Sequence, residues 1–94
     1  MPKAIDIVKR GGRRPSETFD PEKLHASIRA ALLSTKAPVG EANMTALAVT
    51  DTVILWLSDH PEVTSDDLRR IASDRLTVYH PEAAYIYKHH QLIL

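Results

Sequence analysis

The positions at which helices can begin constrain the fold of this chain most strongly. An Asp-Pro-Glu triplet begins at Asp20, whose carboxylate can cap free N–H groups while the proline fits the first helical position. A Thr-Ser-Asp-Asp segment runs from Thr64 to Asp67, and these two residues form a carboxylate version of the capping box. A His-Pro-Glu triplet begins at His80. Together with a central stretch free of Pro and Gly, these signals predict helices at about 21–33, 41–57, 65–78 and 81–92.

Apolar residues recur at helical spacing within these segments. In the first predicted helix, Leu24, Ile28 and Leu32 are four residues apart and would share one face. The second predicted helix carries two apolar stripes: Met44, Leu47, Ala48, Ile54 and Leu55 form one, and Val49, Val53 and Trp56 form the other. A helix that is apolar on two sides is expected to lie in the middle of its neighbours.

The N-terminal segment is predicted to form a β-hairpin over about residues 4–19. Residues 4–10 alternate apolar and polar side chains and are rich in β-branched residues, which is typical of a short strand. Gly11 and Gly12 permit a turn, and Pro15 restricts the returning arm to an edge strand or an irregular path. We therefore expect a mostly α, α+β fold: a single domain, residues 1–94, in which a small four-helix bundle is capped by an N-terminal β-hairpin.

Size and residue types exclude several classes of function. A chain of 94 residues has room for one modest core. The chain has no cysteine, which excludes disulfides, thiolate zinc sites and thiol nucleophiles. Its five histidines include no i, i+4 pair, and there is no P-loop motif, so we expect neither a metal site nor a P-loop ATPase. No signal peptide and no apolar run approaching a membrane span is present, so we expect a cytoplasmic protein without membrane contact.

Charge is distributed unevenly along the chain. The 12 basic and 12 acidic residues balance overall. Residues 1–14 nevertheless hold five basic residues and one acidic residue, a net charge of +4, whereas residues 15–94 have a net charge of −4. A cationic patch on an acidic body fits a site for a small anion better than a broad nucleic-acid surface, and a solvated basic arm is the alternative.

Four segments together resemble the ATP-cone domain. Residues 8–12 (Val-Lys-Arg-Gly-Gly) resemble the first strand and turn of that family, and residues 19–24 (Phe-Asp-Pro-Glu-Lys-Leu) resemble the entry to its first helix. Residues 63–68 resemble the start of its third helix, and residues 84–87 resemble part of its last helix. The order and spacing of the segments match the family across almost the whole chain. Two departures are the six residues between Gly12 and Phe19, where the family usually has fewer, and Tyr87, where it often has arginine.

The resemblance implies an allosteric module that binds ATP or dATP, with Mg²⁺, and is not an enzyme by itself. Members of the family occur on ribonucleotide reductases, on their zinc-ribbon transcriptional repressor and on some kinases, where the nucleotide changes oligomeric state and thereby activity. The expected partners are a fused or separate enzyme such as ribonucleotide reductase, or a second copy of the chain. Because this chain lacks cysteine, we expect either a stand-alone module or part of a longer protein.

The resemblance also implies a set of nucleotide-binding residues. Lys9 and Arg10 would hold phosphates, Lys23 would contact phosphate or ribose, and Glu17 or Asp20 would accept a hydrogen bond from the adenine amino group. The full set is Val8, Lys9, Arg10, Glu17, Phe19, Asp20, Lys23, Leu24, Thr64 and Lys88. The alternative for the lysines and Arg10 is an exposed surface position, and the alternative for Asp20 and Thr64 is a plain helix cap.

The sequence also allows two other functions. The cluster of cations between Lys9 and Arg14 could bind nucleic acid, although no aromatic residue is interleaved with it and nucleic acid is therefore the less favoured partner. Alternatively, the chain could be a structural interaction domain that uses the apolar second or last helix.

Overall fold

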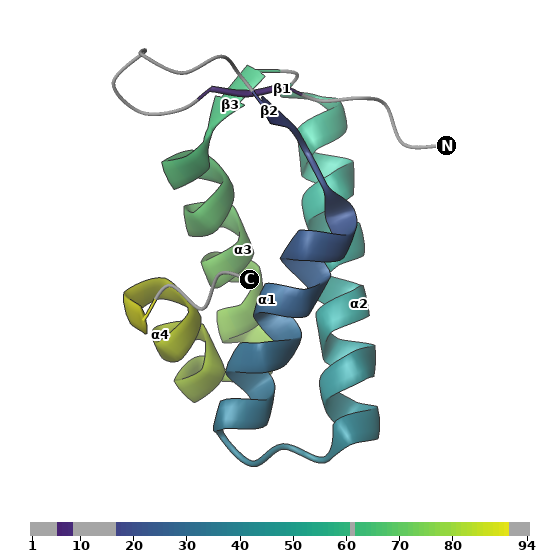
Figure 1. Ribbon diagram of the computed structural model, residues 1–94, viewed down its shortest axis with the longest axis vertical. Helices are drawn as coiled ribbons and strands as arrows, with labels where there is room; N and C mark the ends of the chain where they lie inside the picture. Colours follow the sequence, from purple (N-terminus) through teal and green to yellow (C-terminus); the bar gives the residue numbers. More distant parts are fainter. Residues whose placement is uncertain (1–5, 9–16, 61, 91–94) are drawn as a thin grey trace.

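Four helices make up most of the chain in the computed structural model, which describes residues 6–8, 17–60 and 62–90 (Figure 1). The helices are α1 (Pro21–Ser34), α2 (Val39–Ser58), α3 (Ser65–Tyr79) and α4 (Pro81–His90). They pack in a ring, with α1 against α2 and α4, and α3 against α2 and α4. The starts of α1, α3 and α4 agree with the expected ones, and the other described ends differ by one or two residues; residues 91 and 92, expected in the last helix, lie outside the described residues.

Local capping determines where α1 and α3 begin. The Asp20 carboxylate accepts a hydrogen bond from the Glu22 N–H at 3.0 Å, and Pro21 occupies the first turn, which confirms the predicted N-cap. Thr64 caps α3 in a capping box with Asp67, as predicted. Both caps depend on residues within three positions of each other, so the sequence pattern was sufficient to find them.

His80 connects the start of α4 to the end of α1. Its Nδ1 accepts a hydrogen bond from the Ala83 N–H at 3.1 Å, so the neutral ring carries its proton on Nε2. Nε2 lies 3.3 Å from the Thr35 hydroxyl, which itself donates to the Leu32 carbonyl at 2.6 Å. This chain of hydrogen bonds joins the α3–α4 junction to the C-terminal end of α1.

A single core lies among the four helices. Ile28 and Leu32 of α1, Val53 and Leu57 of α2, and Leu76 of α3 are almost completely removed from solvent. On α2 the stripe of Val49, Val53 and Leu57 faces this core. The other apolar stripe of α2 does not: Met44 is 75% exposed and Leu55 is 71% exposed. The expectation that α2 lies in the middle of its neighbours is therefore wrong, because α2 contacts helices on one side and leaves an apolar face in solvent.

A small sheet lies at the end of the bundle where α1 and α3 begin (Figure 1). It consists of β1 (Asp6–Val8), β2 (Glu17–Thr18) and β3 (Glu62–Thr64) in the order β2-β1-β3. β1 pairs with β2 in antiparallel register and with β3 in parallel register. Its position makes the sheet a junction between the N-terminal segment and the segment that enters α3.

The structure overturns the expected fold class, a four-helix bundle capped by an N-terminal β-hairpin. The molecule is nearly all helical, its described strands have only three, two and three residues, and the central strand pairs with β3 as well as with β2. The prediction of a bundle capped by a hairpin alone was wrong because local alternation over residues 4–19 could indicate only the antiparallel pairing of β1 with β2. The pairing of β1 with β3 joins segments far apart in the chain, and three residues are too few for periodicity to reveal a strand.

Candidate functional site

The sheet brings together segments that carry several of the expected nucleotide-binding residues. In the parallel pairing, Val8 is the register partner of Thr64, the residue that caps α3. On the other side of β1, Glu17 of β2 is the register partner of Ile7. β2 then leads through Phe19 and Asp20 into α1. Four segments of the expected site therefore meet at one end of the molecule.

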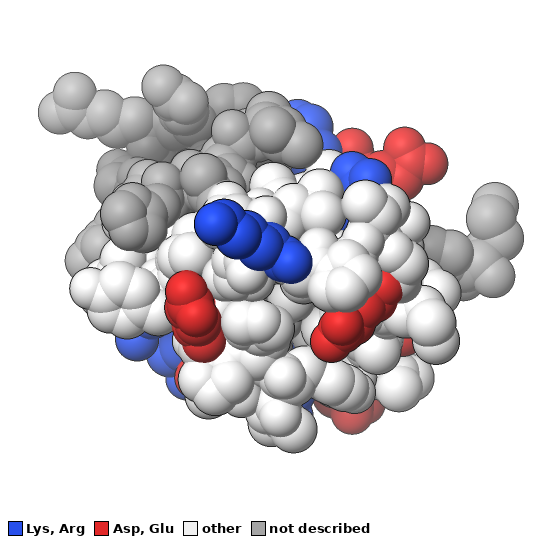
Figure 2. Space-filling model, turned by 90° about the horizontal axis from the view of Figure 1, so that it is seen from below, with Lys and Arg blue, Asp and Glu red and all other residues white. Residues whose placement is uncertain are grey.

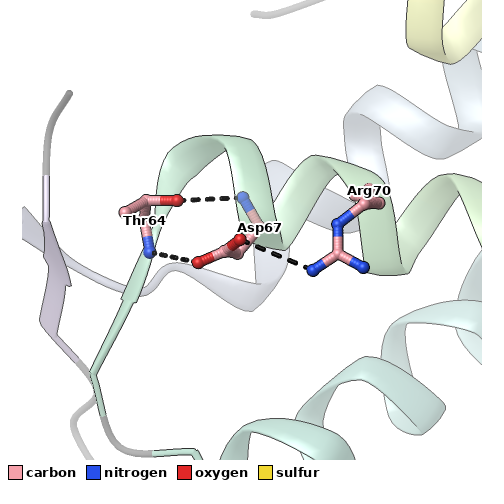
Figure 3. Close-up of polar contacts among 3 residues, drawn as sticks. All are labelled: Thr64, Asp67 and Arg70. Atoms are coloured by element: carbon pink, nitrogen blue, oxygen red, sulfur yellow. Dashed lines mark hydrogen bonds and ion pairs between the residues drawn. The ribbon is translucent and has the colours of Figure 1, made fainter.

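The start of α3 is held by reciprocal hydrogen bonds (Figure 3). The Asp67 N–H donates to the Thr64 hydroxyl at 3.0 Å, and the Thr64 N–H donates to the Asp67 carboxylate at 3.4 Å. Arg70 lies one turn further along and places its guanidinium 3.5 Å from the same carboxylate. The hydrogen bonds from Thr64, with a smaller contribution from Arg70, lower the pKa of Asp67 below its ordinary value.

This geometry limits how the start of α3 could contact a nucleotide. The first turn carries the carboxylates of Asp66 and Asp67, which offset the positive end of the helix dipole and repel phosphate. The Thr64 hydroxyl oxygen accepts one hydrogen bond from the Asp67 N–H, and the side chain also bonds to the Asp67 carboxylate, so its proton could be donated to a ligand only in exchange for that bond. Thr64 is therefore first a helix cap and can additionally act as a hydrogen-bond donor.

The start of α1 offers a cation and a free carboxylate oxygen. Lys23 lies in the first turn and its side chain is exposed. Asp20 uses Oδ1 for the cap, so Oδ2 can still accept a hydrogen bond. Phe19 and Leu24 are buried in the core, so they anchor the backbone at this corner. The two predicted apolar site residues thus have a structural role whatever binds nearby.

Two residues of the last helix do not join this group. α4, which carries the exposed Lys88, packs against α1 and α3, and Figure 1 shows it away from the sheet. Tyr87, the position where the ATP-cone family often has arginine, is a core residue, and its burial raises the pKa of the phenol to about 12. The structure therefore brings neither position to the sheet end.

Lys9 and Arg10, the expected phosphate-binding cations, lie outside the described residues. They directly follow Val8, whose backbone position in β1 is described. For comparison, Figure 2 shows the opposite end of the bundle, where isolated charges of both signs lie on a mostly uncharged surface. That face has no cluster of cations among the described residues.

The sequence did not indicate a pocket of 260 Å³ that lies between the first turns of α1 and residues 47–54 of α2. It is lined by Pro21, Glu22, His25, Leu47, Thr50, Asp51 and Ile54. The Thr50 hydroxyl in this wall is buried and has no hydrogen-bond partner. The apolar stripe that includes Leu47 and Ile54 was the available signal, but it was assigned to the interior.

Similarity to known proteins assigns no function to this chain. The chain matches no protein-family model, and no curated protein sequence or solved structure matches it. Within residues 6–8, 17–60 and 62–90, no group of three or more His, Cys, Asp or Glu side chains could hold a metal ion. In the same part of the chain, no helix is both long enough and apolar enough to cross a membrane.

Proposed function

We propose that this domain is a regulatory module of the ATP-cone type that binds ATP or dATP at the sheet end of the bundle. The observation that carries the proposal is the register pairing of Val8 with Thr64. This pairing lays the strand that leads into Lys9 and Arg10 beside the start of α3. β2, on the other side of β1, leads into α1 and Lys23.

The chemistry of these segments suits a polyphosphate. Lys9, Arg10 and Lys23 would bind the phosphates through charge-assisted hydrogen bonds, for which cations are needed because α3 begins with two carboxylates. The free oxygen of Asp20 or the carboxylate of Glu17 would accept from the adenine amino group, and the Thr64 hydroxyl would donate to the ligand. Mg²⁺ would be held mainly by the phosphates, as is usual for this ion in nucleotide sites.

The proposed activity is regulation without hydrolysis. A bound nucleotide shifts an equilibrium only when it binds one state better than the other. Here it would bridge the cations Lys9 and Arg10 to the start of α1, and so change how the domain docks with a second copy or with a fused or separate enzyme such as ribonucleotide reductase. Such a sensor of nucleotide pools would act in the cytoplasm.

Thermal unfolding with added ligands tests this function. ATP or dATP at about a hundred times its dissociation constant is expected to stabilise the fold by roughly 2.7 kcal/mol, whereas GTP has a smaller effect. Lys9→Ala and Lys23→Ala should lose this shift. Arg75→Ala, which removes an exposed cation from the middle of α3, should keep it.

Two results would contradict the proposal. One is the absence of any shift with either adenine nucleotide. The other is stabilisation by a short oligonucleotide alone, decreasing steeply with salt, which would indicate nucleic-acid binding by the basic segment.

A further inference from the structure

The outer face of α2 is apolar although no described element covers it. On a helix with 3.6 residues per turn, Met44, Leu47, Asp51 and Leu55 fall on one face, opposite the buried stripe that contains Val49 and Val53. Met44 is 75%, Leu47 54% and Leu55 71% exposed. Three large apolar side chains therefore lie along one face, with Asp51 between Leu47 and Leu55, and exposed apolar patches mark interaction surfaces.

The pocket between α1 and α2 lies beside this exposed face. The pocket between α1 and α2 is lined by Leu47 and Ile54 of the apolar stripe and by Pro21 of α1. Towards the other end of α1, the guanidinium of Arg29 donates to the side chain of Asn43 and bridges the two helices. The surface is therefore a groove between two helices that holds a pocket large enough for an apolar side chain.

The charged carboxylates of this groove line the pocket, whereas the cation Arg29 lies towards the other end of α1. Glu22 of α1 and Asp51 of α2 both line the pocket, and α2 contains no Lys or Arg. Within the described part of the chain, neither carboxylate forms an ion pair. His25 is the one other titratable group in the lining. A partner that inserts apolar side chains here would be favoured if it also carried cations opposite Glu22 and Asp51.

From these observations we propose that the groove between α1 and α2 binds an amphipathic helix of a partner protein, with leucine-like residues on one face and Lys or Arg beside them. A helix is favoured because a groove between two helices accepts a third by helix-in-groove packing, with anchors at i, i+3, i+4 and i+7. Met44 to Leu55 spans about 16 Å, which matches three turns of such a helix. The leucine-like anchor fills the pocket, and the cations pair with the two carboxylates.

The same charges disfavour a second copy of this chain as the occupant. Asp51 lies in the middle of the exposed face, with Leu47 and Leu55 one turn away on either side. In a two-fold pairing of α2 with itself, the two Asp51 carboxylates would face each other, and like charges in such contacts are destabilising. The carboxylates would also repel an anionic lipid surface.

A synthetic helical peptide with leucines on one face and flanking lysines tests the proposal on the full chain. A control peptide has the same leucines but glutamates in place of the lysines. Isothermal titration calorimetry should detect binding of the lysine peptide and much weaker binding of the glutamate peptide. Amide chemical-shift changes should be centred on His25, Leu47, Asp51 and Leu55.

Single substitutions test whether the lysine peptide binds to the exposed face of α2. Leu47→Ser and Asp51→Lys should each weaken binding of the lysine peptide by about tenfold or more. Val78→Ser, a matched change at an exposed position of α3, should leave it unchanged. The stabilisation by ATP or dATP should persist in Leu47→Ser, so failure here is distinguishable from failure of the nucleotide site.

Three outcomes would overturn the proposal. Equal binding of both peptides would remove the role of the carboxylates, and shift changes centred on Val78 and Tyr79 would place the interaction elsewhere. Self-association of the chain that is abolished by Leu47→Ser, measured by light scattering during gel filtration, would show that a second copy covers the face.

Discussion

Thr64 and Asp67 bond to each other in both directions at the start of α3. The Asp67 N–H donates to the Thr64 hydroxyl and the Thr64 N–H donates to the Asp67 carboxylate. Thr64 is also the last residue of β3 and the register partner of Val8. The residue that begins α3 therefore also holds the N-terminal strand against the bundle, which links helix capping to the proposed nucleotide site.

Replacing Thr64 by alanine should destabilise the protein by about 1 kcal/mol. The variant leaves the Asp67 N–H without its acceptor, and the Asp67 carboxylate loses its hydrogen bond from the Thr64 side chain. Urea unfolding of Thr64→Ala measures the loss. Thr77→Ala is the matched control, because the Thr77 hydroxyl only donates back to the Ser73 carbonyl within α3; equal effects of the two changes would show that the cap contributes nothing.

Acidification should remove part of this stabilisation. Hydrogen bonds from Thr64 lower the pKa of Asp67 from its ordinary value of 3.8, so the folded state favours the ionised carboxylate. The contribution is present above that value and is lost as the pH falls through the lower pKa of the folded state. Carboxyl-carbon NMR titration should show the Asp67 pKa rising only part of the way towards 3.8 in Thr64→Ala, because the backbone N–H at position 64, the largest cause of the lowered pKa, is retained.

Titrating Asp67 in Arg70→Ala measures the contribution of Arg70 to the lowered pKa. Arg70 contributes less than Thr64 to the lowered pKa of Asp67, so this variant should raise the pKa by a smaller amount. A larger rise in Arg70→Ala than in Thr64→Ala would show that Arg70 contributes more than the Thr64 side chain to the lowered pKa.

Alkaline pH should destabilise the protein through Tyr87. Burial raises the pKa of Tyr87 from 10.0 to about 12, so the unfolded chain loses the phenolic proton at lower pH than the folded chain. The contribution of Tyr87 to the free energy of unfolding is fully present below about pH 10. It decreases by about 2–3 kcal/mol as the pH rises towards 12. Urea unfolding across this range should show the decrease in the wild-type protein and a flatter profile in Tyr87→Phe. Tyr85→Phe, at an exposed position of the same helix, should retain it.

The same substitution should change the free energy of unfolding much more on the buried face of α2 than on its exposed face. Leu57 is fully buried, so Leu57→Ala is expected to cost about 2–5 kcal/mol through lost burial and a new cavity. Leu55 is largely exposed, so Leu55→Ala should change stability by less than about 0.5 kcal/mol. Denaturant unfolding of the pair measures both values, and a large cost for Leu55→Ala would mean that the exposed face is covered in solution.

Features that depend on neighbouring residues were accessible from the sequence. The cap at Asp20, the capping box at Thr64 and the spacing of Leu24, Ile28 and Leu32 all lie within one or a few helical turns. His80 shows the limit of this approach, because its contact with Thr35 joins two helices that are distant in the chain. For the candidate site, the cap roles of Asp20 and Thr64 were predicted, whereas the pocket between α1 and α2 was not.

Hydrogen bonds between residues two or three positions apart cap α1 and α3, so the starts of these helices follow from the local sequence. The pairing of β3 with the N-terminal strand and the exposure of Met44, Leu47 and Leu55 follow instead from how distant segments pack. Two apolar stripes on one helix satisfy the same periodicity. Which of them is buried depends on the helices that pack against it, and those contacts are made between residues far apart in the chain.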